Sequence, residues 1–171
     1  ALVEVDRLAR LVDDLLALAR ADAAEEPAEP LDVAEILQSR REAWSALAAE
    51  RGVELRVEGD GGARVRASPG RLEQVLDNLL ANALDASPAC ATIRVETRPG
   101  ELHVLDEGPG LTAAERERAF DRFWRASSAP GSGLGLPIAR RLVEGDGGTI
   151  ELRDAPTGGV DAVVRYPPSE R

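Results

Sequence analysis

The stretch Gly131-Ser132-Gly133-Leu134-Gly135-Leu136 is the part of this sequence from which the rest can be interpreted. Three glycines alternate with small or apolar residues, and residues 137–143, which follow directly, have the apolar spacing of a helix. Glycine lets a backbone approach a ligand closely, and the free amides at a helix N-terminus favour an anion. The stretch therefore predicts a phosphate-binding loop, although a tight turn made only for packing explains it equally well when it is taken alone.

Composition narrows the function classes. The 171 residues carry a net charge of −10, and all 21 basic residues are arginines. A nucleic-acid-binding domain would usually carry a basic patch, so this acidic sequence argues against that class. An anionic ligand would instead need local arginines, backbone amides or a metal ion. The only cysteine, Cys90, excludes an intrachain disulfide and favours a reducing compartment.

The N-terminal stretch, residues 1–22, is predicted to form one helix. Its apolar residues recur at intervals of three and four, at Val5, Leu8, Val12, Leu15 and Ala19. Further leucines widen this stripe beyond a two-stranded seam, which favours a helix-bundle face; packing on the helix's own domain is the alternative. Acidic residues and two prolines in residues 23–31 then predict a linker.

Beyond the linker, the sequence predicts alternating helices and strands. Asp32 can cap a helix, with Glu35 as its capping-box partner, and Gly52 can end that helix. Further helices are expected at 70–86, at 113–120 and from 137 onward, and strands at 53–58, 64–67, 92–97, 101–106, 149–153 and 160–166.

Two asparagines interrupt the apolar pattern of the helix at 70–86. Asn78 and Asn82 lie one turn apart among apolar residues, and asparagine is costly to bury without partners. Two side-chain amides on one face could bind a shared hydrated ligand or Mg²⁺, which takes oxygen ligands and keeps waters. The alternative is that both cap neighbouring loops. Asp85 follows three residues after Asn82, near the same face.

Two further stretches suggest a ligand pocket. Asp106-Glu107-Gly108-Pro109-Gly110 ends a predicted hairpin, where the Asp106 carboxylate could accept a hydrogen bond from an exocyclic amine; an ordinary Asp-initiated turn is the alternative. The segment Phe120-Asp121-Arg122-Phe123-Trp124-Arg125 then holds three of the five aromatic residues of the sequence.

Taken together, these motifs resemble the ATP-binding catalytic domain of sensor histidine kinases. Asn78–Ala83 resembles the N box, Asp106–Gly110 the G1 box, Phe120–Phe123 the F box and Gly131–Leu136 the G2 box, in the same order and spacing. The resemblance assigns residues 32–168 to this domain.

Residues 1–22 resemble the second helix of the dimerisation and phosphotransfer domain of the same kinases. The resemblance implies an α+β fold, a two-layer α/β sandwich with a mixed β-sheet and helices on one face, preceded by this N-terminal helix. ATP would lie between the helices and a lid.

The resemblance also implies roles for individual residues. Asn82 would ligate Mg²⁺, Asn78 would support a phosphate or a metal-bound water, and Asp106 would bind the adenine amine. The implied ATP-binding set is Asn78, Asn82, Asp85, Asp106, Gly108, Gly110, Phe120, Arg122, Phe123, Arg125, Gly131, Ser132, Gly133, Leu134, Gly135 and Leu136.

The implied function is transfer of the ATP γ-phosphoryl group to a histidine of a dimerisation domain, followed by signalling to a response regulator. The full-length protein is expected to be a homodimer, and no nucleic acid is expected as a partner. The chain begins at Ala1, so we expect a fragment. No apolar run of membrane-spanning length and no signal peptide are visible, which predicts a cytoplasmic chain, or the cytoplasmic part of a membrane-bound sensor.

The sequence departs from the family in three ways. Asp85 stands where the family often has lysine, and Arg122 and Arg125 are candidates to replace that cation. The lid between Trp124 and Gly131 is short. The acceptor histidine is missing, and the only histidine, His103, is expected to be an exposed strand residue on the face of the sheet away from ATP. This chain alone is therefore predicted not to phosphorylate itself.

Three alternatives remain open from the sequence. An ATP hydrolase like the gyrase and heat-shock chaperone relatives would carry glutamate at the position of Asn78, and asparagine cannot act as that base. The bundle-type helix at 1–22 argues against a serine kinase of the anti-sigma type. The short lid and Asp85 are compatible with a non-catalytic nucleotide-binding or interaction module of the same fold.

Overall fold

The computed structural model describes residues 27–59, 64–126 and 132–167. The helix expected at 1–22 and Gly131 of the glycine stretch lie outside the described residues. The described elements are β1 (Glu29–Asp32), α2 (Val33–Glu50), β2 (Glu54–Glu58), β3 (Arg64–Ala67), α3 (Arg71–Ala86), β4 (Thr92–Arg98), β5 (Glu101–Leu105), α4 (Ala113–Arg118), α5 (Gly135–Gly145), β6 (Thr149–Asp154) and β7 (Val160–Arg165).

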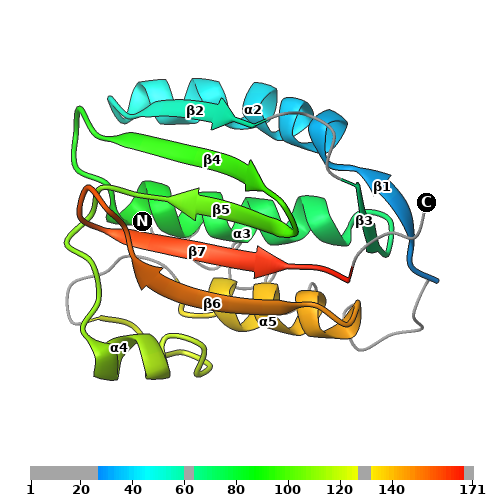
Figure 1. Cartoon of the computed structure of the whole chain (residues 1–171). Helices are drawn as coiled ribbons and strands as arrows, with labels where there is room; N and C mark the ends of the chain where they lie inside the picture. Colours follow the sequence, from blue (N-terminus) through cyan, green and yellow to red (C-terminus); the bar gives the residue numbers. More distant parts are fainter. Residues whose placement is uncertain (1–26, 60–63, 127–131, 168–171) are drawn as a thin grey trace, which may run out of the picture.

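Five strands form one mixed sheet in the order β2-β4-β5-β7-β6. Strands β2 and β4 are parallel, and the other neighbouring pairs are antiparallel. The helices α2, α3 and α5 all cover the same face of this sheet (Figure 1). This arrangement confirms the predicted two-layer α/β sandwich.

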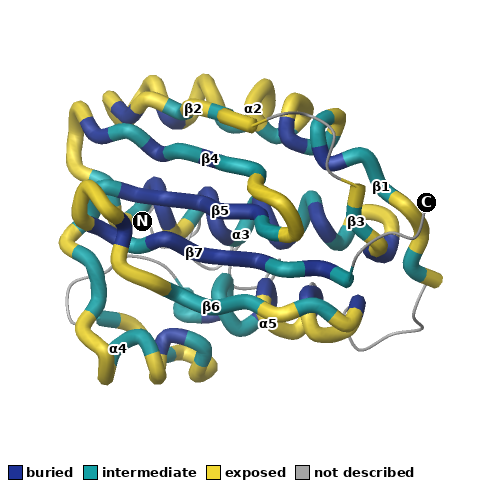
Figure 2. The backbone as a smooth tube through the Cα atoms, in the orientation of Figure 1, coloured by how far each residue is buried: buried dark blue, intermediate teal, exposed yellow. Residues whose placement is uncertain are grey.

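The core lies between the sheet and these helices because both surfaces are apolar. Leu72, Leu76 and Leu79 of α3 are at most 2% exposed, and alternate residues of the central strands, such as Ile93 and Val104, face them in the same buried cluster. Figure 2 shows that β5 and β7 are buried along most of their length. Strand β7, which comes late in the chain, therefore supplies part of the centre of the core.

Three details differ from the sequence-based expectation. Residues 29–31, expected in the linker, belong to β1, because they pair antiparallel with β3 in a separate two-stranded sheet. Asp32 caps α2 by accepting a hydrogen bond from the Ala34 N–H at 2.9 Å, and within the described residues Glu35 makes no reciprocal capping-box bond. Helix α5 begins at Gly135, so the last glycine of the stretch is already helical.

A buried polar cluster of Ser68, Arg71 and Asp146 joins the start of α3 to the end of α5. The Asp146 Oδ1 accepts hydrogen bonds from the Ser68 hydroxyl at 2.7 Å and from Arg71 Nη1 at 3.0 Å, and Oδ2 accepts one from the Ser68 N–H at 3.1 Å. Tyr166 lies near this cluster, and its burial raises the pKa of its hydroxyl. These contacts fix the two helices relative to each other.

None of the helices in residues 27–59, 64–126 and 132–167 has both the length and the apolar character needed to cross a membrane.

Candidate functional site

Helices α3 and α5 bring the two asparagines against the glycine stretch. A Cβ atom placed on Gly135 would lie 3.1 Å from Asn82 Nδ2 and 3.4 Å from Asn78 Oδ1, so the backbone of α5 begins directly beside both amides. Asn78 donates its Nδ2 to the Gln74 carbonyl at 2.9 Å. Within the described residues the exposed Asn82 side chain makes no hydrogen bond. The oxygens of both amides are therefore left for a ligand or a metal ion.

The N-terminus of α5 offers backbone amides at the same place. Its N-cap is Leu134, whose apolar side chain is fully buried and gives no capping hydrogen bond. The Leu134 N–H is bound by the Ser132 hydroxyl at 3.2 Å, while Leu136 packs partly buried against the core. The uncapped first-turn amides can accommodate an anion such as a phosphate. The predicted phosphate-binding role of this stretch therefore fits the local geometry.

Asp106 lies just after the end of β5 in a cradle of glycine backbone. Its Oδ1 accepts hydrogen bonds from the Gly108 N–H at 2.8 Å and the Val160 N–H at 3.2 Å. Only glycine fits at position 159, because a Cβ there would lie 2.5 Å from this same oxygen; Gly110 lies against the Gly159 carbonyl. Burial raises the pKa of Asp106, and the two backbone hydrogen bonds partly oppose that effect. The second carboxylate oxygen is left for a ligand amine.

The aromatic segment is held to the glycine stretch by its backbone. The Phe123 N–H donates to the Gly133 carbonyl at 2.9 Å. A Cβ on Gly133, whose φ is +74°, would lie 2.8 Å from the carbonyl carbon of Phe123. Phe123 itself has a φ of +63°, which is uncommon for a residue with a side chain, and the residue as a whole is 63% exposed. Phe120 is packed beneath the Arg140 guanidinium at 5.3 Å.

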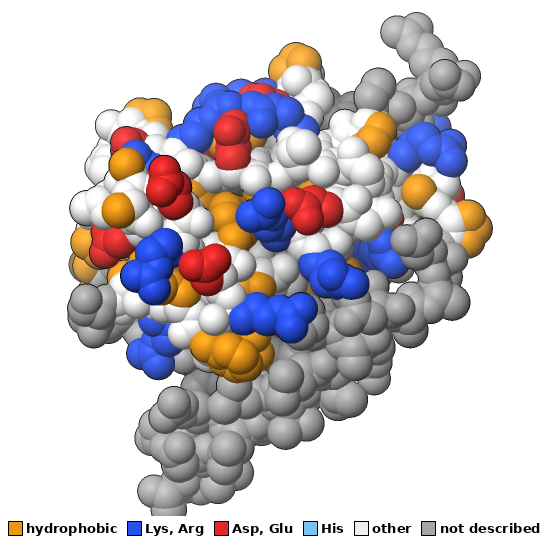
Figure 3. All heavy atoms as spheres, turned by 90° about the horizontal axis from the view of Figure 1, so that it is seen from below, with side chains coloured by type: hydrophobic (Ala, Val, Ile, Leu, Met, Phe, Trp, Pro, Cys, Tyr) orange, Lys and Arg blue, Asp and Glu red, His pale blue; other side chains and the backbone are white. Residues whose placement is uncertain are grey.

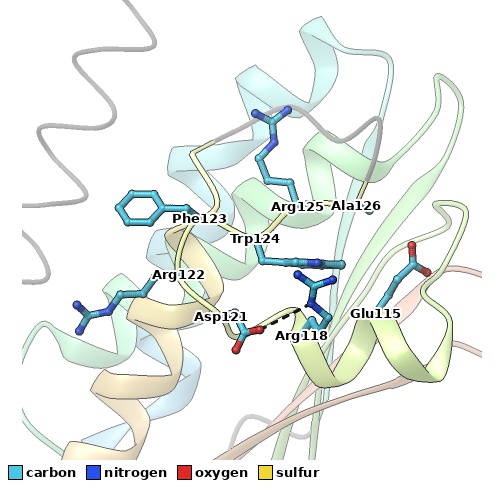
Figure 4. A pocket seen from close by; sticks show the side chains of 8 residues that line it. All are labelled: Glu115, Arg118, Asp121, Arg122, Phe123, Trp124, Arg125 and Ala126. Carbon is cyan, nitrogen blue, oxygen red and sulfur yellow. Dashed lines mark ion pairs between the residues drawn. The ribbon is translucent and has the colours of Figure 1, made fainter.

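A separate hollow of about 880 Å³ lies beside this segment (Figure 4). Trp124 lies flat over the Arg118 guanidinium at 5.8 Å, and Arg118 pairs with Asp121 at 3.9 Å. The side chains of Arg122 and Arg125 extend in different directions from the segment (Figure 4). The lining residues of the hollow are Glu115, Arg118, Asp121, Arg122, Phe123, Trp124, Arg125 and Ala126. Neither asparagine nor Asp106 lines it, so the hollow adjoins the asparagine site without including it.

The surface over α4 and α5 carries both signs of charge, with arginine and acidic side chains interspersed (Figure 3). The net charge of −10 is therefore not reflected in a uniformly acidic face on this side of the molecule.

Asp85 is engaged by a cation rather than exposed as a lone carboxylate. Arg51, which is the C-cap of α2, donates from Nη1 to Asp85 Oδ1 at 2.7 Å. The side chains of Arg51 and Asp85 are 42% and 21% exposed. The acidic residue that follows Asn82 by three positions is thus paired with an arginine from another part of the chain.

The prediction that His103 is an exposed strand residue is wrong. His103 is fully buried, with its two ring nitrogens 3.0 Å from Asp161 and 3.1 Å from Glu101. Polar neighbours surround the imidazole. One of them, Glu101, is also bound by Arg165, which holds the pKa of the Glu101 carboxyl below its usual range. Its strand neighbours Leu102 and Val104 belong to the helix-side core, so the imidazole lies on the other face of the sheet.

The residues that could hold a metal ion in this region are the two asparagines rather than a cluster of acidic or histidine side chains. Among the described residues, no group of three or more His, Cys, Asp or Glu side chains could hold a metal ion. An amide oxygen such as that of Asn82 could still hold Mg²⁺, since this ion keeps several waters and needs few protein ligands.

Two contributors to this region were missed from the sequence. Gly159 and the Val160 N–H complete the surroundings of Asp106, and Arg51 pairs with Asp85. For Gly159 and Val160, the local sequence signal is the glycine pair Gly158-Gly159, which adopts positive φ in the structure. No local signal identifies Arg51, because its partner is 34 residues away.

Comparison with known proteins places this geometry in a family. The sequence profile of the family described as "Histidine kinase-, DNA gyrase B-, and HSP90-like ATPase" matches residues 67–170. The sensor protein IrlS of Burkholderia pseudomallei is 35% identical over 162 residues, which cover 90% of this chain and 35% of that protein. The signal transduction histidine-protein kinase/phosphatase MprB of Mycobacterium tuberculosis is 34% identical over 166 residues, covering 92% and 32%. The chain thus spans about a third of the length of these relatives.

Solved structures agree with these relatives. Full-length ShkA in complex with AMPPNP superposes with a TM-score of 0.83 at 30% identity, covering 97% of this chain and 37% of that one. The mycobacterial sensor histidine kinase MprB superposes with a TM-score of 0.70 at 30% identity, covering 84% and 99%. The predicted resemblance to sensor histidine kinases is confirmed.

Proposed function

The chain belongs to the family of histidine kinase-, DNA gyrase B- and HSP90-like ATPases, and we propose that residues 32–168 are the ATP-binding kinase domain of a sensor histidine kinase. The proposed reaction moves the γ-phosphoryl group of ATP to a histidine on a dimerisation and phosphotransfer domain. The observation that carries the proposal is the meeting of Asn78 and Asn82 with the uncapped N-terminus of α5.

The adenine is proposed to bind at Asp106. Its Oδ1 is occupied by the Gly108 and Val160 amides, which fixes the carboxylate and directs the other oxygen to the exocyclic amine. The glycines at 108 and 159 keep side chains away from this carboxylate. Asp106 therefore selects adenine through a single oriented acceptor.

The phosphates are proposed to lie against Ser132–Gly135 and the amides that begin α5. Phosphoryl transfer depends mainly on positioning and on neutralising charge, and Mg²⁺ supplies part of that neutralisation. Asn82 would hold the metal ion and Asn78 would orient a phosphate or a metal-bound water. Asn78 cannot take a proton from water, which favours transfer to a protein histidine over hydrolysis.

The remaining parts of the proposal concern partners. Residues 1–22 would be the second helix of the dimerisation domain, and residues 23–28 would be the connection to β1 of the kinase domain. The full-length protein would be a homodimer that passes the phosphoryl group to a response regulator. This assignment rests on the motif order and on the sensor-kinase relatives.

Calorimetry with ATP, with and without Mg²⁺, tests the site. Asn82→Ala should weaken binding of Mg-ATP about tenfold or more and should affect metal-free ATP much less, since it removes a metal ligand. Gln38→Ala, which removes an amide from the exposed Gln38–Glu42 contact on α2, is the matched control. Equal losses with and without Mg²⁺ would remove Asn82 from the metal site. Asn78→Asp tests in parallel whether a carboxylate raises hydrolysis.

Labelled ATP tests the reaction. The chain should label a separately supplied helical-hairpin domain that bears the acceptor histidine, and should itself stay unlabelled. Self-labelling is not expected at His103, because its ring lies on the face opposite the helices and in-line transfer requires the nucleophile within about 3–3.5 Å. Acid-labile phosphate on the chain that is lost in His103→Ala would contradict the site assignment.

A further inference from the structure

The proposed site lacks a cation on α3. A nucleoside triphosphate carries several negative charges, whereas Asn78, Asn82 and the α5 amides are uncharged. The sequence contains no lysine, so only arginine can supply a permanent positive charge. On the exposed face of α3, the acidic residues Asp77 and Asp85 are each bound by an arginine from α2.

These two arginines are committed to different degrees. Arg40 contacts both oxygens of Asp77, which also accepts a hydrogen bond from the Trp44 indole at 2.7 Å, and Arg40 donates further to the Ser39 hydroxyl. Within the described residues, the Arg51 side chain makes one hydrogen bond only, from Nη1 to Asp85. The other guanidinium donors of Arg51 are therefore available, and the side chain is 42% exposed.

Arg51 binds α3 near the end of the helix that also carries Asn82. Asp85 follows Asn82 by three residues, so the two side chains lie on one face of the helix about 4.5 Å apart along its axis. Arg51 reaches Asp85 from the end of α2 and so binds the acidic residue that follows Asn82 by three positions on α3. A phosphate bound beside Asn82 would therefore face the same side of α3 as the Asp85–Arg51 pair.

We propose that Arg51, held in place by Asp85, is a cation that binds the polyphosphate of the nucleotide in this protein. The proposal rests on the function proposed above. A guanidinium presents a planar fork of donors that suits phosphate oxygens, and pairing with a carboxylate through one nitrogen leaves that fork usable. Asp85, an acidic residue at an anion site, is then a positioning residue for Arg51.

The competing explanation is a surface ion pair that only ties the end of α2 to the end of α3. Such exposed pairs contribute little to stability, and this one would have no effect on nucleotide affinity. The two explanations differ in what happens when the charges are removed one at a time.

Calorimetry with ATP and with adenosine separates them. Arg51→Ala should weaken ATP about tenfold or more, because it removes a charged hydrogen-bond donor and leaves Asp85 uncompensated, while adenosine binding should not change. Arg51→Ala combined with Asp85→Ala should recover part of the loss, and Arg51→Ala combined with Asp85→Lys should recover most of it by placing a cation on α3.

Arg56→Ala is the matched control, since it makes the same change in net charge and breaks an exposed pair with Glu54 at 2.8 Å on β2. If Arg51→Ala and Arg56→Ala bind ATP equally well, or if Asp85→Lys gives no recovery, the proposal is wrong. If the unaltered chain binds no ATP, the proposed function itself fails. Binding by the unaltered chain with no effect of Arg51→Ala overturns only the role of Arg51.

Discussion

Helices α3 and α5 contact each other near both of their ends, and among the described residues the polar groups are paired at one end and unpaired at the other. At the start of α3, Asp146 is almost fully buried and bound by both Ser68 and Arg71. Toward the other end of the same helix pair, Asn82 is exposed without a hydrogen-bond partner in the described residues, and α5 begins with an uncapped turn.

The difference separates two uses of polarity. A buried polar group is costly unless it is paired, so the contacts within the Ser68–Arg71–Asp146 cluster stabilise one arrangement of the two helices. Unpaired groups at the other end contribute nothing to the fold and remain able to bind. Mutations at the first end should therefore change stability, and mutations at the second should mainly change affinity.

The largest effect should come from Asp146→Ala. Removing one partner of a buried ion pair leaves the other uncompensated, and we expect the free energy of unfolding in urea to fall by about 3 kcal/mol. ATP affinity, measured where the variant is still folded, should change less than about twofold. Glu144→Ala, in an exposed pair with Arg140, is the control and should cost less than about 0.5 kcal/mol. A similar small loss for Asp146→Ala would remove the distinction between the two ends.

Gly133→Ala should have the next largest effect, and at the other end. The new Cβ would lie 2.8 Å from the Phe123 backbone, so the aromatic segment or the start of α5 must move. We expect ATP affinity to fall about tenfold, together with a loss of about 1–2 kcal/mol in stability. Gly100→Ala has the same φ of +74° with no atom near the added Cβ, so it measures the backbone strain alone. Equal affinities for the two variants would show that the Phe123 contact does not support the site.

Asp106→Asn tests whether the buried charge of Asp106, near the unpaired end, lowers the stability of the fold. Burial raises the pKa of Asp106 above its unfolded value, so its contribution to stability is fully present below the unfolded pKa and is lost as pH rises through the folded pKa. Asparagine keeps the acceptor for Gly108 and Val160 without the charge. Unfolding at pH 7 should therefore become more costly by about 1 kcal/mol or less, with no gain at pH 3. ATP affinity and the preference over GTP should fall; destabilisation at pH 7 would contradict this.

Arg140→Ala should give the smallest effect. Its guanidinium lies 5.3 Å from the Phe120 ring at an exposed position, where such contacts contribute about 0.5–1 kcal/mol. Stability should fall by no more than that, and ATP affinity should change less than threefold. A larger loss of affinity would make Arg140 part of the phosphate surroundings.

The sequence predicted the parts of the site that lie within short motifs. Asn78 and Asn82 are one helical turn apart, and the glycine stretch precedes its own helix, so spacing alone relates them. Contacts over long sequence separations were not predicted. The Val160 N–H donates to Asp106 across 54 residues. His103 is bound by Asp161 of the neighbouring strand β7, which is 58 residues away in the sequence.

The fold shows the same limit. The helices and strands of the sandwich follow from apolar periodicity. Strand β1 does not, because Pro30 and the acidic residues around it give no strand signal by themselves and predict a linker. Its strand character comes from pairing with β3. Side chains that depend on a partner strand, such as His103, were misjudged for the same reason.

The position of β7 also has a consequence for synthesis. This strand lies between β5 and β6, yet it follows both along the chain, and its first residue supplies an N–H to Asp106. A chain emerging from the ribosome would present Asp106, both asparagines and the glycine stretch before β7 exists. The nascent domain would therefore have an incomplete set of contacts around Asp106 and an open sheet centre until nearly all of residues 32–168 had been translated.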